Sequence, residues 1–226
     1  MKKTVLLPLT ISFFLTLAAC GSQPERQADE NKAAPDRGTI VCVGDSLTAG
    51  YGIAAEQSYP AQLAKKIGGA GLGFRVINAG VSGETSSGTL SRINWILTLK
   101  PDIIILETGA NDGLRGIAPP LIRKNISEII RRLQGEKIII ILAGMQMLRN
   151  LGPAYTGAFN AIYEDIAGET GVLFMPFFLK GVATDPDLNI TDGIHPNAQG
   201  YAIIVDNLFP YVLKAINRST ERAAVE

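Results

Sequence analysis

Hydrophobic runs bounded by turn residues recur along the chain and alternate with segments in which apolar residues follow a helical spacing. Two runs contain only isoleucine and leucine, which is typical of parallel strands buried on both faces. The pattern predicts strands at residues 39–43, 74–77, 103–106, 138–142 and 172–175, and helices near residues 58–67, 85–98, 119–134, 154–168 and 198–216. This alternation predicts an α/β fold, a three-layer α/β/α sandwich with a five-stranded parallel sheet.

The first twenty residues have the pattern of an export signal. Lys2 and Lys3 precede an apolar stretch over residues 5–19, which falls short of the ~20 apolar residues that span a bilayer. We therefore predict a signal peptide over residues 1–19. The stretch ends in Leu-Ala-Ala-Cys-Gly, which resembles the bacterial lipobox, and the resemblance implies acylation of Cys20. The alternatives are an uncleaved anchor helix and ordinary cleavage beside an incidental cysteine.

The residues after the signal divide the rest of the chain. Residues 20–38 are polar, charged and contain proline, so they are predicted to be a lipidated flexible tether. Residues 39–216 form the predicted folded domain, and residues 217–226 a polar tail. An acylated chain would lie in the bacterial cell envelope. Because Ser22 rather than aspartate follows Gly21, the resemblance favours the periplasmic face of the outer membrane, or a secreted or periplasmic protein if Cys20 is not acylated.

Composition narrows the classes of function. The 226 residues include 21 Lys and Arg and 21 Asp and Glu, so the formal net charge is zero, which argues against nucleic acid as a partner. Cys42 lies between two valines and is predicted to be a buried structural thiol. The single histidine, His195, cannot build a usual transition-metal site with scattered carboxylates, so we expect no metal and no cofactor.

Small and polar residues follow three of the predicted strands and precede the last helix. In a parallel sheet, ligands bind beyond the carboxyl ends of the strands, so these segments are candidates for the chemistry. They are residues 44–48 (GDSLT), 78–85 (NAGVSGET), 107–113 (ETGANDG) and 192–196 (DGIHP).

A serine nucleophile needs an adjacent base, and the base needs an orienting partner. His195 is the only imidazole in the chain, and Asp192 precedes it by three residues, close enough in a turn to reach the ring. Ser46 follows the first strand on a tight turn that Gly44 permits. We expect Asp45 to hydrogen-bond within this turn and support the serine.

The four segments together resemble the signature blocks of the SGNH hydrolases, also called the GDSL family. The resemblance covers residues 39–215, and within the family the chain is most similar to the secreted arylesterase, acyl-thioesterase and lysophospholipase subgroup. It implies a flavodoxin-like sheet, with Ser46 as nucleophile, His195 as general base and then acid, and Asp192 as the orienting carboxylate. It also implies an oxyanion hole formed by the backbone N–H groups of Ser46 and Gly83 and the side-chain amide of Asn111. Spacing alone would not separate Gly83 from the nearby Gly80; the match to the block favours Gly83.

The resemblance implies a serine esterase that hydrolyses aryl or acyl esters, thioesters or lysophospholipids through an acyl-enzyme on Ser46. The alternatives are an O-acetyl esterase or transferase acting on envelope polysaccharide, and a non-catalytic ligand-binding lipoprotein. The expected partners are a small ester or thioester and, through the lipid, a membrane. Apolar loop residues near the strand ends are Tyr51, Ile53, Leu114, Ile117, Met147, Leu148 and Tyr155. Of these, the predicted substrate-binding residues are Leu114, Ile117, Met147 and Leu148; ordinary loop packing is the alternative for each.

Overall fold

The fold is built on a parallel sheet of five strands. The structure, a computed structural model, describes residues 37–147 and 151–223. The strands are hydrogen-bonded in the order β2-β1-β3-β4-β5, and every neighbouring pair is parallel. Their bounds are β1 Gly38–Gly44, β2 Phe74–Gly80, β3 Ile103–Glu107, β4 Ile139–Ala143 and β5 Leu173–Met175. The predicted five-stranded parallel sheet is confirmed.

The two isoleucine-rich strands lie side by side at the centre of the domain. In the β3–β4 register, Ile103 pairs with Ile139 and Ile104 with Ile140, and every residue of both strands is buried. Burial of apolar surface contributes about 25 cal/mol per Å², so these two strands stabilise the centre of the sheet. The continuous apolar runs in the sequence therefore correspond to strands covered by helices on both faces.

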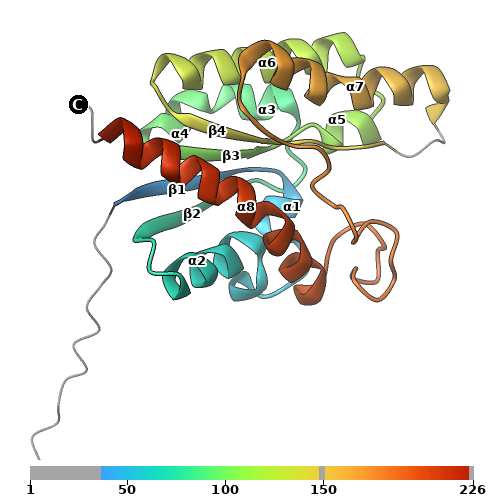
Figure 1. Ribbon diagram of the computed structural model, residues 1–226. Helices are drawn as coiled ribbons and strands as arrows, with labels where there is room; N and C mark the ends of the chain where they lie inside the picture. The colour runs from blue at the N-terminus through green and yellow to red at the C-terminus, as the bar shows by residue number, and fades with distance from the viewer. Residues whose placement is uncertain (1–36, 148–150, 224–226) are drawn as a thin grey trace, which may run out of the picture. The chain divides into compact units, whose positions relative to one another are not determined.

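Two layers of helices cover the sheet, as Figure 1 shows. The helices α2 and α8 pack on one face, and α3, α4, α6 and α7 pack on the other. Short turns, α1, η1 and α5, lie near the carboxyl ends of β1 and β3. The bounds are α1 Ser46–Ala49, η1 Ala55–Gln57, α2 Tyr59–Gly69, α3 Ser86–Ser91, α4 Ile93–Thr98, α5 Ala110–Leu114, α6 Pro119–Gly135, α7 Pro153–Thr170 and α8 Ala198–Ala223.

The helix predicted over residues 85–98 is two helices. Its first part, α3, ends before Arg92, and α4 begins after it; Arg92 has φ −103° and ψ 13°, outside helical values. The guanidinium of Arg92 forms a two-point ion pair with Glu84, which holds this residue at the break. The spacing of apolar residues cannot predict a helix break that is one residue long.

The last helix is longer than the sequence suggested. The helix α8 continues to Ala223, so the prediction of a polar tail over residues 217–226 is wrong for residues 217–223. Polar residues there belong to exposed helical turns. Arg222 donates a hydrogen bond to the backbone carbonyl of Lys137, and Thr220 donates one to the carbonyl of Ile216. The first contact joins the end of the helix to the segment before β4, and the second lies within the helix itself.

The carboxyl ends of β1 and β3 meet where the strand order reverses. The chain passes from β1 to β2 on one side and then continues with β3 on the other, which makes the β1/β3 edge the expected ligand site. Two glycines allow the turn after β1 to pack closely there. A Cβ at Gly44 would lie 2.2 Å from Oγ1 of Thr48, and a Cβ at Gly80 would lie 2.2 Å from the backbone nitrogen of Ala49. Any larger residue at either position would displace α1.

The predicted signal peptide, Cys20 and the tether over residues 20–36 lie outside the described residues. Within residues 37–147 and 151–223, no helix combines the length and the apolar character needed to cross a bilayer.

Candidate active site

Ser46 is the first residue of a single helical turn at the end of β1. Asp45 caps this turn, because its carboxylate accepts a hydrogen bond from the backbone N–H of Leu47 at 2.9 Å. The turn ends at Gly50, which has φ 82°, a left-handed conformation that favours glycine. Tyr201 of α8 donates a hydrogen bond to the backbone carbonyl of Leu47 at 2.8 Å. Ser46 is therefore held by both the sheet and the last helix.

His195 and Asp192 lie on the loop before α8 and face Ser46. The distance from Nε2 of His195 to Oγ of Ser46 is 2.8 Å, and that from Nδ1 to Oδ2 of Asp192 is 2.7 Å. If Nδ1 donates to the carboxylate, Nε2 is left to accept from the serine hydroxyl. The three predicted residues thus form one continuous chain of hydrogen bonds.

Backbone contacts hold the His195 loop in place. Oδ1 of Asp192 accepts the N–H groups of Ile194 at 2.9 Å and His195 at 3.0 Å, while the carbonyl of His195 accepts the N–H of Ile190 at 2.8 Å. Asn197 caps α8 by accepting N–H groups from its first turn. Burial raises the pKa of Asp192, but these hydrogen bonds and the His195 ring outweigh it, so the pKa is lowered overall.

Asn111 projects from α5, the turn that follows β3. Its Nδ2 donates a hydrogen bond to Oδ2 of Asp45 at 2.9 Å, and a primary amide nitrogen carries a second N–H. The turn begins after Gly109, which has φ 106° and leaves no room for a Cβ beside the hydroxyl of Tyr163, 2.4 Å away. The structure therefore ties Asn111 to the residue next to Ser46.

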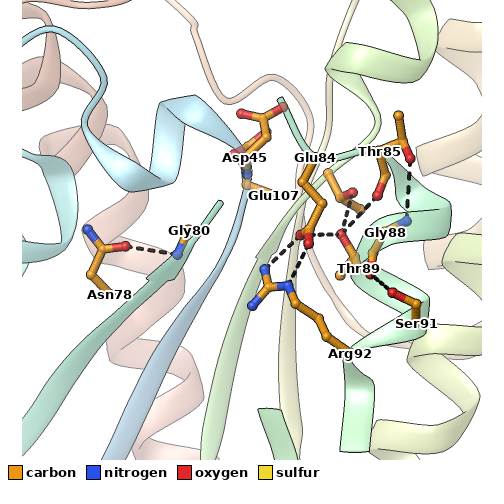
Figure 2. A network of polar contacts seen from close by, with 11 residues as sticks. Asp45, Asn78, Gly80, Glu84, Thr85, Gly88, Thr89, Ser91, Arg92 and Glu107 are labelled. Atoms are coloured by element: carbon orange, nitrogen blue, oxygen red, sulfur yellow. Dashed lines mark hydrogen bonds and ion pairs between the residues drawn. The ribbon is translucent and has the colours of Figure 1, made fainter. Parts of the chain in front are cut away.

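Gly83 lies on the loop between β2 and α3, with φ 79°. The guanidinium of Arg115 donates to its carbonyl at 2.9 Å. The next residue, Glu84, is fixed by the ion pair with Arg92 at 2.6 and 2.7 Å and by the hydroxyl of Thr89 at 2.9 Å, as Figure 2 shows. Among the described residues, no acceptor takes the N–H of Gly83 or that of Ser46.

A family model described as the GDSL-like lipase/acylhydrolase family matches residues 42–203. The chain belongs to this family.

Characterised relatives and a solved structure agree with that assignment. The esterase TesA of Pseudomonas aeruginosa is 36% identical over 173 residues, which are 76% of this chain and 86% of TesA. The thioesterase 1/protease 1/lysophospholipase L1 of Escherichia coli is 33% identical over 183 residues, 80% of this chain and 86% of its own. The psychrotrophic esterase EstA of Pseudoalteromonas, solved with monoethylphosphonate as inhibitor, is 31% identical with a TM-score of 0.76, covering 80% and 99% of the two chains.

These findings confirm the predicted family and fold, and the protein is a serine hydrolase that acts on ester bonds. The Ser46–His195–Asp192 hydrogen bonds supply the arrangement that such an esterase needs.

Apolar side chains surround the esterase site on its solvent side. Four large apolar residues are each 46% to 55% exposed and are sequence neighbours or contacts of the site residues: Tyr51, Val81, Leu114 and Ile194. The ring of Tyr51 lies 4.8 Å from that of His195, centroid to centroid. Exposed apolar side chains near Ser46 and His195 are suited to an apolar part of a substrate.

The predicted substrate-binding residues differ in how far their side chains are exposed to solvent. Leu114 is exposed, whereas Ile117 and Met147 are partly buried and pack against the core. Met147 also fills the space beside Gly113, where a Cβ would lie 2.4 Å from its sulfur. For these two residues the structure supports the alternative of loop packing. Leu148 lies outside the described residues.

The described part of the chain contains no group of three or more His, Cys, Asp or Glu side chains placed to hold a metal ion. Cys42 is buried, as predicted, and burial raises the pKa of its thiol to about 12 although a hydrogen bond with Tyr59 opposes this. The thiol is therefore protonated and unreactive at neutral pH.

Two contributors to the site were not identified from the sequence. Arg115, which holds Gly83, carries no motif that separates it from other loop residues. Tyr51 was predicted only as an apolar loop residue near the strand ends, without its packing on the ring of His195. Glu107 is fully buried beneath α1, the helical turn that begins with Ser46. A charged residue that ends the apolar run of β3 was the available signal, because an ionisable group at the end of a buried strand requires a partner.

Proposed function

We propose that the enzyme hydrolyses carboxylic esters and thioesters that carry an apolar acyl or aryl group, through an acyl-enzyme on Ser46. The observation that carries this proposal is the unbroken chain from Oγ of Ser46 through the ring of His195 to the carboxylate of Asp192. Such a chain activates a hydroxyl that is a weak nucleophile by itself.

The reaction has two halves. In the first, Oγ of Ser46 attacks the carbonyl carbon while Nε2 of His195 takes the hydroxyl proton, and Asp192 stabilises the imidazolium. The tetrahedral intermediate collapses with cleavage of the ester bond, and the leaving alcohol or thiol receives the proton from His195. In the second half, His195 deprotonates a water that attacks the acyl-enzyme, and Ser46 recovers its proton as the acid is released.

The developing oxyanion requires fixed donors. The backbone N–H groups of Ser46 and Gly83 and the second N–H of the Asn111 amide are available for this, because Asp45 occupies only one of the two amide protons. Donors held in place before the reaction stabilise the transition state without reorganisation, and losing one costs on the order of 3 kcal/mol.

The preference for an apolar substrate is supported by the exposed residues around the site. Tyr51 contacts the ring of His195, and Leu114 and Val81 extend from the two loops that carry Asn111 and Gly83. One similar enzyme is named thioesterase 1/protease 1/lysophospholipase L1. We therefore place long-chain esters and thioesters ahead of acetylated polysaccharide.

A panel of substrates tests this order. The full-length protein is assayed with p-nitrophenyl esters of increasing acyl length, an acyl thioester, a lysophospholipid and an acetylated polysaccharide. We expect kcat/KM to increase with acyl length by about tenfold for each 1.4 kcal/mol of added apolar contact. Ser46→Ala, which removes only the hydroxyl, is the control and should abolish turnover. Removal of acetyl groups alone, or full activity in the variant, contradicts the proposal.

We also propose that residues 1–19 are removed and that Cys20 is acylated, which places the enzyme on the periplasmic face of the outer membrane. The lipobox-like sequence supports this, and the export signal is too short to span a bilayer. Growth with a clickable fatty acid should label the wild type and leave Cys20→Ser unlabelled and soluble after fractionation. Equal labelling of the two proteins contradicts the anchor.

A further inference from the structure

Two carboxyl groups are buried together beneath α1, the helical turn that begins with Ser46. Asp45 is 1% exposed and Glu107 is fully buried, and they come from the ends of β1 and β3 (Figure 2). A buried carboxylate is costly unless it is paired with a cation or fully hydrogen-bonded. Neither group forms an ion pair with a lysine or arginine among the described residues. The pair therefore needs an explanation other than charge neutralisation by a base.

The contacts of Glu107 show how its two oxygens differ. Oε2 accepts the backbone N–H of Asp45 at 3.2 Å and the hydroxyl of Thr48 at 2.9 Å. Gly44 makes this approach possible, because a Cβ there would lie 2.5 Å from Oε2. Oε1 is buried and receives no donor. Oε2 has two donors, whereas Oε1 has none, so Oε1 is the oxygen that can carry the proton of a neutral carboxyl and donate it to a neighbouring acceptor.

The contacts of Asp45 are those of an ionised group. Its Oδ1 accepts the N–H of Leu47 and its Oδ2 accepts the amide of Asn111, each at 2.9 Å. Its backbone N–H donates to Oε2 of Glu107 at 3.2 Å, so the two carboxyl groups are close neighbours. Asp45 thus has donors for both oxygens, and Glu107 is the neighbour that can supply one more.

The electrostatics agree with this division. Burial raises the pKa of Glu107 well above its ordinary value, and the charge of Asp45 raises it further, against the hydrogen bond from Thr48. Burial raises the pKa of Asp45 as well, although hydrogen bonds from Leu47, Glu107 and Asn111 and the charge of His195 oppose that rise. The other titratable groups that face the pair are Cys42 of β1, Tyr59 of α2, Tyr163 of α7, Tyr201 of α8 and His195. Of these only His195 can carry a positive charge, and it faces Asp45.

We propose that Glu107 is a positioning residue for the oxyanion hole: as a neutral carboxylic acid, it donates a hydrogen bond to Asp45, which in turn holds the amide of Asn111 toward the substrate. The inference deepens the proposed function and rests on it, since Asn111 matters only if an oxyanion forms beside Ser46. Glu107 itself does not touch the substrate.

The proton on Glu107 has two consequences for the site. It keeps the buried pair at one negative charge, where a second charge would repel both Asp45 and the developing oxyanion. It also provides the donor that fixes the rotamer of Asp45, and a misplaced catalytic group costs up to ~10²-fold in rate for about 1 Å of displacement. Removing the donor should therefore affect the chemical step and leave substrate binding unchanged.

The test compares Glu107→Gln and Glu107→Leu in the full-length protein with a p-nitrophenyl ester. Glutamine keeps a donor for Asp45 and an acceptor for Thr48, so we expect kcat within about threefold of the wild type. Leucine has neither, so we expect kcat to fall by ~10- to 100-fold with KM changed less than about twofold. In an Asn111→Ala background, Glu107→Leu should have little further effect, because Glu107 acts through Asn111.

Three outcomes would overturn the positioning role. In the first, Glu107→Leu keeps the wild-type kcat. In the second, the losses of kcat in Glu107→Leu and Asn111→Ala multiply in the double variant, and in the third, Glu107→Gln loses as much kcat as Glu107→Leu. A failure of the proposed function is a different result, because it appears as undiminished activity in Ser46→Ala. Circular dichroism and the mass of a fluorophosphonate adduct verify that each variant is folded and retains its nucleophile.

A second measurement tests the neutral state and does not need the leucine variant to fold. A carboxyl with a raised pKa in the folded state binds more protons than in the unfolded state above its ordinary value of 4.5. Its stabilising effect is therefore complete below that value and is lost as the pH rises. The free energy of unfolding of the wild type, relative to Glu107→Gln, should fall steadily from about pH 5 to pH 8. A difference that is constant over this range contradicts a protonated Glu107.

Discussion

The two halves of the active site are stabilised in different ways. The acid–base half, Asp192 and His195, is held by contacts between residues three positions apart, and the Asp192 side chain is 34% exposed. The proposed oxyanion half includes Asp45 and Glu107, which are at most 1% exposed and whose partners are 62 and 66 positions away in the sequence. One half forms within a loop, and the other exists only when β1 and β3 are paired.

This difference in burial predicts how substitutions in each half affect the rate and the stability. Water screens the charge of Asp192, so its effect depends on geometry at the His195 ring. The Asp45–Glu107 pair is unscreened, so a lost donor leaves a buried group unsatisfied and shifts its neighbours. We expect substitutions in the first half to reduce the rate by the larger factor and substitutions in the second half to affect both rate and stability.

The largest effect short of removing the nucleophile is expected for Asp192→Asn. The amide still fits the loop but favours the wrong tautomer of His195 and cannot stabilise its charged form, so kcat should fall by up to ~10⁴-fold with little change in melting temperature. Steady-state kinetics and thermal unfolding measure the two quantities.

Asp187→Asn is the matched control, because Asp187 is exposed on the same loop and its side chain is outside the hydrogen-bonded chain. It should keep the wild-type rate. If Asp192→Asn retains more than about a tenth of the wild-type kcat, the claim that Asp192 orients the His195 imidazole for catalysis is contradicted.

A smaller loss is expected for Asn111→Ala, in the oxyanion half. The substitution removes one donor to the oxyanion and leaves Oδ2 of Asp45 with one partner fewer, so kcat should fall by ~10²- to 10³-fold while KM is nearly unchanged. The free energy of unfolding should also decrease by about 1 kcal/mol, the value of one buried hydrogen bond.

Asn207→Ala removes a side-chain hydrogen bond on α8, to the carbonyl of Lys180, away from the site, and serves as the control. An Asn111→Ala enzyme with wild-type kcat would remove Asn111 from the oxyanion hole. A loss of stability without a loss of rate would assign it a structural role only.

The sequence predicts the parts of this molecule that depend on local pattern. Continuous apolar runs located the five strands, and the spacing of Asp192 and His195 suggested that they meet. The rest depends on packing between distant segments. The break at Arg92 coincides with an ion pair to Glu84, and the end of α8 contacts the backbone of Lys137.

The support of the oxyanion half could not be predicted for the same reason. Glu107 follows an apolar run and reads as an ordinary strand end, and its partners Asp45 and Thr48 are identified only when β1 and β3 lie side by side. Ile117 and Met147, which are predicted to bind substrate, also pack against the core, and their positions in the sequence did not indicate that packing.

The covalent adduct formed with a fluorophosphonate tests the central claim most directly. The reagent reacts with a serine that is activated by an adjacent base and stabilised by oxyanion donors, so it reports the whole arrangement in one step. We predict one adduct per wild-type chain, located at Ser46 by peptide mass, and none in Ser46→Ala or His195→Ala. An adduct at another residue, or equal labelling of the Ser46 variant, would contradict the account.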